Sequence, residues 1–351
     1  MADTQAAVWL GGQVARHCVD YSTEPACLNT GGRWAVVVEF TGQFHAWRFD
    51  DWRPGTPDEW ALAWHGPALN DWESSMSRDE YVAAVEQLRD NIARGEVYQA
   101  NVCRRLSAPM PTAEAADLFG LSALLAAHNP APFAGCISAP EQGISIATAS
   151  PELFLRRQQR ELMSSPIKGT GQIAEQMGAK DRAENVMIVD LVRNDLSRVA
   201  VPGSVEVPHL LRVEQHPGLF HLVSDVTCRL ADGVGWSQIL AGTFPPGSVT
   251  GAPKSSALRL IDELEPVDRG PYCGAIGWVD ATDQTAELAV GIRTFWLSGS
   301  DKQRQLNFGT GAGITWGSNP QAEWEETELK AATLIRAAAR QWSPGNNGQQ
   351  R

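Results

Sequence analysis

The pattern of hydrophobic and polar positions changes character near residue 77. Before it, Ala35–Phe40 (AVVVEF) and Phe44–Phe49 (FHAWRF) are short runs rich in β-branched and aromatic residues, which is typical of strands. Thr41–Gln43 separates them with a glycine, so the pattern predicts a β-hairpin. Seven of the thirteen tryptophans also lie in this region. A stacking platform for bases would need basic residues among them, so we interpret these tryptophans as packing residues.

From Ser77 onward the pattern becomes helical. Ser77 followed by Glu80 forms a capping box, the sequence signature of a helix start. Apolar residues then recur with the 3.6-residue period of a helix face, and Gly95 stands where such a helix ends. The apolar stripe consists of Tyr81, Val85, Leu88 and Ile92.

The remaining elements alternate irregularly along the chain. Helical patterns cover 113–128, 180–196, 255–265 and 322–340, and strand patterns cover 97–102, 135–138, 144–148, 153–157, 203–207, 220–228, 275–279, 286–295 and 306–308. Because strands and helices do not alternate regularly, the predicted class is α+β rather than doubly wound. We expect a short β-rich region over 1–76 that packs on a main domain over 77–341, followed by a disordered tail over 342–351.

Composition narrows the class of protein. The chain has 351 residues, with 29 Lys and Arg against 41 Asp and Glu, and 43% of it is hydrophobic. An acidic chain lacks the electrostatic footprint of a nucleic-acid-binding protein. No apolar run approaches the roughly 18 residues of a membrane span. Residues 1–10 contain no basic residue and do not match a signal peptide. We therefore expect a cytoplasmic protein whose partners include neither nucleic acid nor membrane.

Six cysteines are scattered along the chain without a C-x-x-C pair. In a chain of this length they are interpreted as reduced core thiols, not as a disulfide framework or a zinc site.

Two pairs of acidic residues are candidates for metal binding. Asp181 and Glu184 are three residues apart, so they share one helix face, which continues with apolar residues. Glu323 and Glu326 repeat this spacing at the start of the last helix. Oxygen ligands from two helices suit a hard cation such as Mg²⁺. From spacing alone, the alternative is that Glu323 and Glu326 complement the dipole at a helix N-terminus.

Glycine-rich segments and one lysine complete the candidates that spacing provides. Gly309–Gly313 (GTGAG) follows a strand pattern, and its backbone N–H groups could bind an anion as a turn. Lys168 lies in a rigid Pro-Ile-Lys-Gly segment. Beside a cation its ammonium form would be disfavoured, which would make it a nucleophile. The alternative is a solvated surface lysine.

Several ordered motifs resemble the chorismate-utilising enzymes, and within them the branch that makes 4-amino-4-deoxychorismate. The resemblance covers roughly residues 77–340. The motifs are SPEL at 150–153, PIKGT at 166–170, KDRAENVMIVD at 180–190, RND at 193–195, GSVTGAPK at 247–254, and GAG at 311–313 followed by the pair of glutamates at 323 and 326.

The resemblance implies two packed antiparallel sheets flanked by helices, with 77–341 as the catalytic, chorismate-binding domain. It implies Mg²⁺ bound by Glu184 and Glu326, with Glu323 and Asp181 in support. Glu152 matches the general acid of the family, and Lys168 matches the lysine that forms a covalent intermediate. The residues that match substrate-binding positions are Tyr272, Arg293, Gly311, Ala312, Gly313, His221, Ser248 and Gln99.

The resemblance also implies the reaction. Members that add water carry a lysine where this chain has Gln99, which favours ammonia as the nucleophile, and anthranilate-forming members carry a small residue where this chain has Lys168. No G-x-C-x-G glutaminase motif occurs, so ammonia is expected from a separate glutamine amidotransferase subunit or as free ammonia. The alternatives are an anthranilate-type enzyme and a non-catalytic chorismate-binding subunit.

Overall fold

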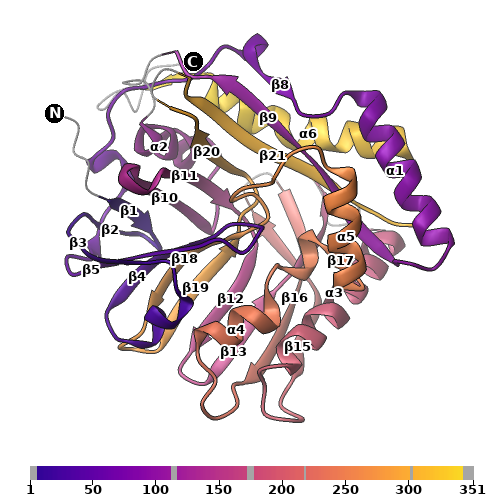
Figure 1. Ribbon diagram of the computed structural model, residues 1–351, viewed down its shortest axis with the longest axis horizontal. Helices are drawn as coiled ribbons and strands as arrows, with labels where there is room; N and C mark the ends of the chain where they lie inside the picture. Colours follow the sequence, from indigo (N-terminus) through magenta and orange to yellow (C-terminus); the bar gives the residue numbers. More distant parts are fainter. Residues whose placement is uncertain (1–5, 112–116, 172–177, 217–218, 301–302, 343–351) are drawn as a thin grey trace.

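Two large antiparallel β-sheets form the centre of the molecule, and helices pack on their outer sides (Figure 1). The computed structural model describes residues 6–111, 117–171, 178–216, 219–300 and 303–342. Apolar side chains from both sheets, among them Leu10, Trp34, Ile137 and Leu155, meet in one hydrophobic core. The predicted α+β class with two packed antiparallel sheets is therefore confirmed.

The first sheet has ten strands within the described residues, and their order does not follow the chain. Nine form a continuous path, and β8 (Glu73–Ser74) pairs with β9 beside it. The path runs β17 (Gly251–Ala252), β9 (Gln99–Pro109), β21 (Gln305–Ile314), β20 (Thr294–Ser298), β11 (Ile144–Ser150), β10 (Phe133–Ala139), β1 (Ala7–Leu10), β2 (Gln13–Ala15) and β6 (Arg53–Pro54).

The second sheet also has ten strands within the part of the chain that the structure describes. Its path runs β14 (Ile167–Gly171), β16 (Leu219–Arg229), β13 (Glu161–Ser165), β12 (Leu153–Gln158), β19 (Thr285–Val290), β18 (Ala275–Asp280), β4 (Arg33–Val38), β5 (Phe44–Phe49) and β3 (Cys18–Ser22). The strand β15 (Glu206–His216) pairs with β16, and a separate two-stranded sheet joins β7 (Trp64–His65) to β22 (Gln341–Trp342).

The α-helices of the described residues are α1 (Arg78–Ala93), α2 (Leu118–His128), α3 (Ala179–Ser197), α4 (Trp236–Thr243), α5 (Lys254–Leu264) and α6 (Pro320–Ala338). The capping box predicted for α1 is present, because the Ser77 hydroxyl accepts the N–H of Glu80 and the Glu80 carboxylate accepts the N–H of Ser77. In the second sheet, α3 packs on β14 and β16; in the first, α6 packs on β21. These two helices carry the predicted acidic pairs.

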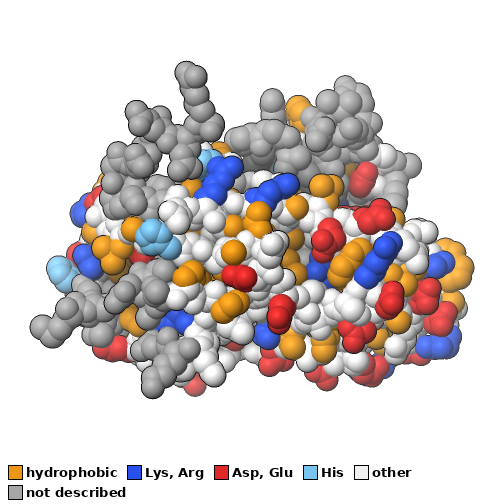
Figure 2. Space-filling model, turned by 90° about the horizontal axis from the view of Figure 1, so that it is seen from above, with side chains coloured by type: hydrophobic (Ala, Val, Ile, Leu, Met, Phe, Trp, Pro, Cys, Tyr) orange, Lys and Arg blue, Asp and Glu red, His pale blue; other side chains and the backbone are white. Residues whose placement is uncertain are grey.

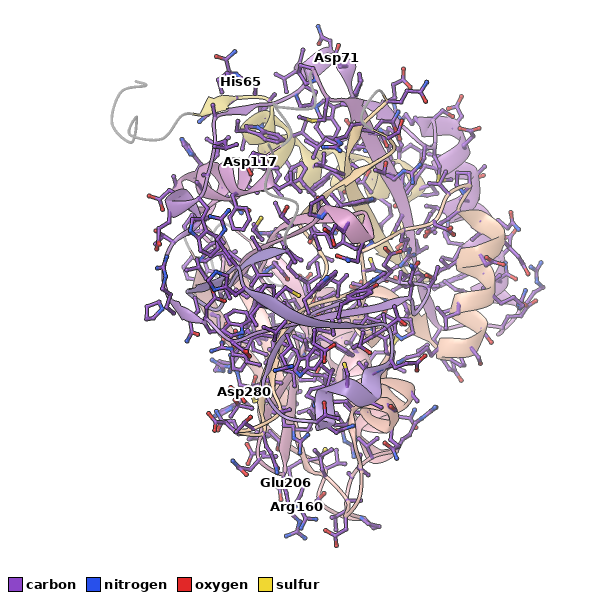
Figure 3. The ribbon with its side chains drawn as sticks, turned by 60° about the vertical axis from the view of Figure 1, so that its left-hand side comes forward. His65, Asp71, Asp117, Arg160, Glu206 and Asp280 are labelled. Atoms are coloured by element: carbon purple, nitrogen blue, oxygen red, sulfur yellow. The ribbon has the colours of Figure 1, made fainter. Side chains whose placement is uncertain are left out.

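Strands from before residue 77 join both sheets. The predicted hairpin is present as β4 and β5, and β4 pairs with β18 while β1 pairs with β10. Trp34, Trp47 and Trp64 are fully buried, which confirms packing as their role. The Asp117 carboxylate caps α2 and also accepts the N–H of Leu62. Figure 3 shows Asp117 at the same end of the molecule as His65 and Asp71, whereas Asp280, Glu206 and Arg160 lie toward the opposite end.

Two strand predictions and one turn prediction need correction. The run 286–295 is two strands, because the chain leaves the second sheet after β19 and enters the first as β20. The strand predicted at 203–207 begins at Glu206 and continues to His216 as β15. Gly309–Gly313 is not a turn, since it forms the second half of β21 and pairs with β9. Glycines in a strand mark close approach of neighbouring groups, and that is the case here.

The cysteines, the helices, the surface and the C-terminal residues each bear on an expectation from the sequence. All six cysteines are free, and four of them are buried, as predicted. Among the described residues, no helix is both long and apolar enough to cross a membrane. Figure 2 shows acidic, basic and hydrophobic side chains interspersed over one face of this chain of net charge −12. From residue 343 on, the predicted tail lies outside the described residues.

Candidate active site

Two crossings between the sheets bring Glu152 and Arg293 to the centre of the molecule. The chain passes from β11 to β12 at residues 151–152, and from β19 to β20 at residues 291–293. Hydrogen bonds join the crossings, from the N–H of Val290 to the Glu152 carbonyl at 3.0 Å and from the N–H of Ala149 to the Arg293 carbonyl at 3.0 Å. The backbone at Arg293 has φ +52°, a conformation that bends the strand pattern at this point. Packing of the two sheets therefore fixes both residues.

Ser248 links the two predicted catalytic side chains. Lys168 on β14 donates from Nζ to the Ser248 carbonyl at 3.0 Å. The Ser248 hydroxyl and the N–H of Ile167 lie close enough to the Glu152 carboxyl to oppose the rise of its pKa. Glu152 and Ser248 are both 4% exposed. An amine and a carboxyl group thus converge on one residue inside the protein.

Burial shifts the pKa values of both groups in the direction that favours their neutral forms. It lowers the pKa of the Lys168 amine, a shift that the carboxylates of Glu152 and Glu184 oppose. Burial also raises the pKa of the Glu152 carboxyl, while the hydroxyl of Ser248 and the charge of Lys168 oppose that shift. Desolvation favours the neutral form of an amine and of a carboxylic acid alike. The site therefore favours a nucleophilic amine beside a proton donor.

The glycine-rich half of β21 presents backbone groups to an edge of the sheet. β20 pairs with β21 only over 305–308, and β9 covers the other edge along its whole length. Gly311 faces Cys103 and Gly313 faces Asn101, yet the N–H groups of Cys103 and Asn101 donate to Glu265 and Thr250 instead. These are non-hydrogen-bonded pairs, so the N–H groups of Gly311 and Gly313 point away from β9. That direction suits binding of an anionic group such as a carboxylate.

Side chains crowd these glycines. A Cβ on Gly313 would lie 2.7 Å from Nε2 of Gln99 and 3.5 Å from Nζ of Lys168, and one on Gly311 would lie 2.5 Å from Sγ of Cys103. Gln99 is fully buried, and within the described residues neither polar atom of its side chain has a hydrogen-bond partner. Buried polar atoms are almost always satisfied. The Gln99 amide is therefore available to a bound molecule beside Lys168.

Two carboxylates, one on α3 and one on α6, lie within electrostatic range of Lys168. The negative charges of Glu184 on α3 and Glu326 on α6 both act to raise the pKa of the Lys168 amine. Among the described residues, no three His, Cys, Asp or Glu side chains form a compact metal-binding group. Mg²⁺ is commonly held by one or two carboxylates together with oxygens of the substrate, so two glutamates from two helices fit its donor chemistry.

The other two predicted metal residues have contacts of their own. The Asp181 carboxylate accepts the N–H of Gly178 at 2.9 Å at the start of α3, and its Cβ packs on Gly169. Glu323 is 5% exposed and, with Glu326, raises the pKa of Tyr81, a shift whose largest cause is burial. Capping of α3 is therefore the role that the structure gives Asp181 directly.

The remaining predicted residues surround this centre. The Tyr272 ring covers Gly309 so closely that a Cβ there would lie 2.1 Å from it. Burial lowers the pKa of Arg293, and His221 is 2% exposed on β16 opposite Thr170. Ala312 is buried between its two glycine neighbours on β21.

Sequence reasoning missed two residues of the site. Asn101 lies two residues after Gln99 on β9, and its Nδ2 donates to the Ser248 carbonyl at 3.5 Å. Lys330 lies one helical turn after Glu326, pairs with it at 2.6 Å and donates to the Gly311 carbonyl at 3.1 Å. Spacings of i+2 on a strand and i+4 on a helix were the available signals.

Comparison with known proteins agrees with this arrangement. Residues 57–336 match the family described as chorismate binding enzyme. Aminodeoxychorismate synthase component 1 of Salmonella typhimurium is 39% identical over 75% of this chain and 58% of its own length. Anthranilate synthase component 1 of Thermus thermophilus is 36% identical over 81% of this chain and 61% of its own length. The chain thus spans about three fifths of the length of these curated relatives.

Among solved structures, anthranilate synthase component I from Streptococcus pneumoniae superposes with a TM-score of 0.73. It is 24% identical, and the match covers 95% of this chain and 90% of that one. At this identity the likeness establishes the fold alone. The family match covers most of the chain, and the motifs that carry it meet around Lys168 and Glu152, so the chain belongs to the chorismate binding enzyme family.

Proposed function

We propose that this protein aminates chorismate at C4, as the chorismate-binding component of an aminodeoxychorismate synthase. The observation that carries the proposal is the joint contact of Lys168 and Glu152 with Ser248, with the pKa of the amine lowered and that of the carboxyl raised. Both directions match what the chemistry needs, a neutral amine and a protonated acid. Similarity to aminodeoxychorismate synthase component 1 supports the same choice.

In the proposed reaction, the amine of Lys168 attacks C2 of chorismate. The double bonds of the ring shift, the C4–O bond breaks, and Glu152 protonates the departing hydroxyl, which leaves as water. Ammonia then attacks C4, and the C2–N bond breaks with its electron pair returning to nitrogen, which restores the neutral amine of Lys168. The new ammonium at C4 gives a proton to the Glu152 carboxylate, which restores the acid. The product is 4-amino-4-deoxychorismate.

Binding groups surround this chemistry. The N–H groups of Gly311 and Gly313, together with Arg293, would hold carboxylates, and the Gln99 amide would bind a polar group of the ring. Glu184 and Glu326 would hold Mg²⁺, which when bound neutralises a carboxylate of the substrate.

An anthranilate-type reaction, with ammonia adding at C2, is the second candidate. Relatives named anthranilate synthase component 1 are nearly as similar, at 36% identity for that of Thermus thermophilus. The position of Lys168 favours the first candidate, because a lysine at C2 blocks direct addition of ammonia there.

The test is incubation of the purified chain with chorismate, MgCl₂ and ammonium chloride at raised pH, followed by mass spectrometry of the product. We expect 4-amino-4-deoxychorismate, which a lyase converts to p-aminobenzoate. Anthranilate as product would favour the second candidate, and binding of chorismate without turnover would indicate a non-catalytic subunit.

The variant Lys168→Ala sharpens this test. Glu152 remains able to protonate the C4 hydroxyl, while C2 is open to ammonia, so we expect turnover at least tenfold slower with the amino group moved to C2. That factor corresponds to about 1.4 kcal/mol or more of activation free energy. Arg193→Ala, which removes an exposed cation on α3, should behave as wild type. Wild-type rate and product in Lys168→Ala would disprove the covalent step.

A further inference from the structure

A largely buried lysine outside the site just described holds the segment that leads into the turn carrying Ser248. Lys254 is the first residue of α5, and its side chain is 17% exposed. A cation at a helix N-terminus opposes the helix dipole, and buried lysines are uncommon. Sequence positions that break two general preferences at once often serve a function.

The ammonium group of Lys254 has three donors, and three acceptors surround it. Nζ donates to Oδ2 of Asp195 at 2.6 Å, to the Pro245 carbonyl at 2.8 Å and to the Thr243 carbonyl at 3.0 Å. The Asp195 side chain is 6% exposed. One ion pair thus joins α3, the end of α4 and the start of α5.

The segment held by Lys254, residues 243–245, leads directly into the turn that contains Ser248, called here the Ser248 turn. Residues 247–249 form one turn of 3₁₀ helix, closed by a hydrogen bond from the Thr250 hydroxyl to the Pro246 carbonyl at 3.0 Å. Gly247 lies against Leu191 of α3, where a Cβ would approach to 2.8 Å. Asp195, Ser248 and Glu152 line one small internal cavity. The turn therefore has little freedom while Lys254 holds the segment before it.

We propose that Lys254 and Asp195 are positioning residues: by fixing the Ser248 turn, they hold the side chains of Lys168 and Glu152 in place. The Ser248 carbonyl accepts a hydrogen bond from the Lys168 amine and its hydroxyl lies beside the Glu152 carboxyl, so a displacement of this turn changes both contacts together. The proposal depends on the proposed function only for the chemistry that Lys168 performs. Where Lys168 lies, and how its amine titrates, can be measured without turnover.

The main test uses the double variant Lys254→Met/Asp195→Leu. Removing both charges leaves no unpaired ion in the interior, and such replacements are often neutral or stabilising. The matched control is Arg259→Met, which removes an exposed cation from the same helix. Melting temperature and circular dichroism establish folding for each variant.

The primary readout is the reactivity of Lys168 toward acetic anhydride across a pH series, quantified by mass spectrometry of the Lys168 peptide. In the wild type, the amine of Lys168 should titrate at a lower pH than the amine of an ordinary lysine. In the double variant we expect its titration to move toward that of an ordinary lysine, because the loosened turn admits water. Acetylation at neutral pH should fall severalfold, while Arg259→Met matches the wild type.

Turnover supplies a second readout. For chorismate amination, we expect kcat of the double variant to fall at least tenfold while KM changes less than threefold, since binding groups on β21 stay in place. If the proposed function is wrong, the acetylation result still decides the positioning role. A double variant with unchanged titration of Lys168 overturns the proposal, whatever happens to its melting temperature.

A second variant covers the case in which the double variant does not fold. Lys254→Arg keeps the ion pair with Asp195, but a planar guanidinium cannot direct donors to the same three acceptors as an ammonium. We expect near-native stability with a smaller shift of Lys168 in the same direction. Native titration and native kcat in this variant would count against a positioning role.

Discussion

At the scale of single residues, burial shifts the pKa values of two groups of the site toward the charge states that water disfavours at neutral pH. Lys168 and Glu152 are each shifted toward neutrality by burial, and each partly restores the charge of the other. A neutral buried acid is a known way to keep a proton donor at pH 7. The cost of this arrangement appears in the free energy of unfolding.

Glu152→Gln should make this cost measurable. The folded-state pKa of Glu152 is raised, so its stabilising contribution is complete below its unfolded pKa and is lost as the pH rises through the folded value. The variant should therefore exceed the wild type in Tm at pH 7 by roughly 2 °C, as a change of about 1 kcal/mol gives. The difference should vanish near pH 4. Thermal melts across this range test it, with Glu141→Gln, an exposed glutamate, as control.

Gly313→Ala should damage catalysis without unfolding the protein. The new methyl group would meet the Gln99 amide at 2.7 Å and approach Nζ of Lys168. We expect kcat/KM to fall tenfold to a hundredfold, or about 1.4–2.8 kcal/mol. Gly317→Ala is the matched control, because nothing lies within 4 Å of a Cβ at that position. Equal kinetics for the two variants would contradict the proposed contact of Gly313 with the substrate site.

Sequence reasoning reached many residues of the site through motifs, but not their arrangement. It interpreted Gly309–Gly313 as a turn because glycines usually mark turns. Here the glycines are needed for space, since Tyr272, Cys103 and Gln99 press on them in a strand. Lys330 was missed because a lysine one turn after a glutamate is equally typical of a solvated helix face.

At the scale of elements, α3 and α6 pack on different sheets, yet each carries a carboxylate within electrostatic range of Lys168. Their boundaries followed from periodicity and caps, and the predicted helices agree with the observed ones within two residues at each end. The division of 286–295 into two strands could not be predicted. The apolar pattern continues through the crossing, and only packing decides which sheet each half joins.

Glu184→Gln and Glu326→Gln should weaken the dependence on Mg²⁺ that we propose for these helices. Losing one of two carboxylates should reduce activity at least a hundredfold, and a higher Mg²⁺ concentration should be needed for half-maximal rate. Glu325→Gln, an exposed neighbour on α6, should leave the Mg²⁺ dependence unchanged. Initial rates over a Mg²⁺ titration measure this, and full activity in excess chelator would rule out the metal site.

At the scale of the whole molecule, the two thiols that are not fully buried are poorly suited to glutamine hydrolysis. All six cysteines lie in the described residues, and only Cys18 and Cys27 are not buried. Burial raises the pKa of both thiols, which disfavours the thiolate that a glutaminase needs.

The purified chain should therefore use ammonium salts but not glutamine as nitrogen source. Adding a separate glutamine amidotransferase subunit should restore use of glutamine. Product formation can be followed with ¹⁵N-labelled ammonium and amide-labelled glutamine in parallel. Label from glutamine in the product of the isolated chain would show that it contains a glutaminase site.

The pairing of β1 and β4 with strands from much later in the chain has a consequence for synthesis. Trp64, too, donates a buried hydrogen bond to the carbonyl of Ala338, 274 residues away. At translation rates of roughly 5–20 residues per second, the first strands leave the ribosome many seconds before their partners exist. During that interval, the edge of β4 that later pairs with β18 has no partner strand. The nascent chain therefore exposes this edge of β4 until the residues of β18 have emerged.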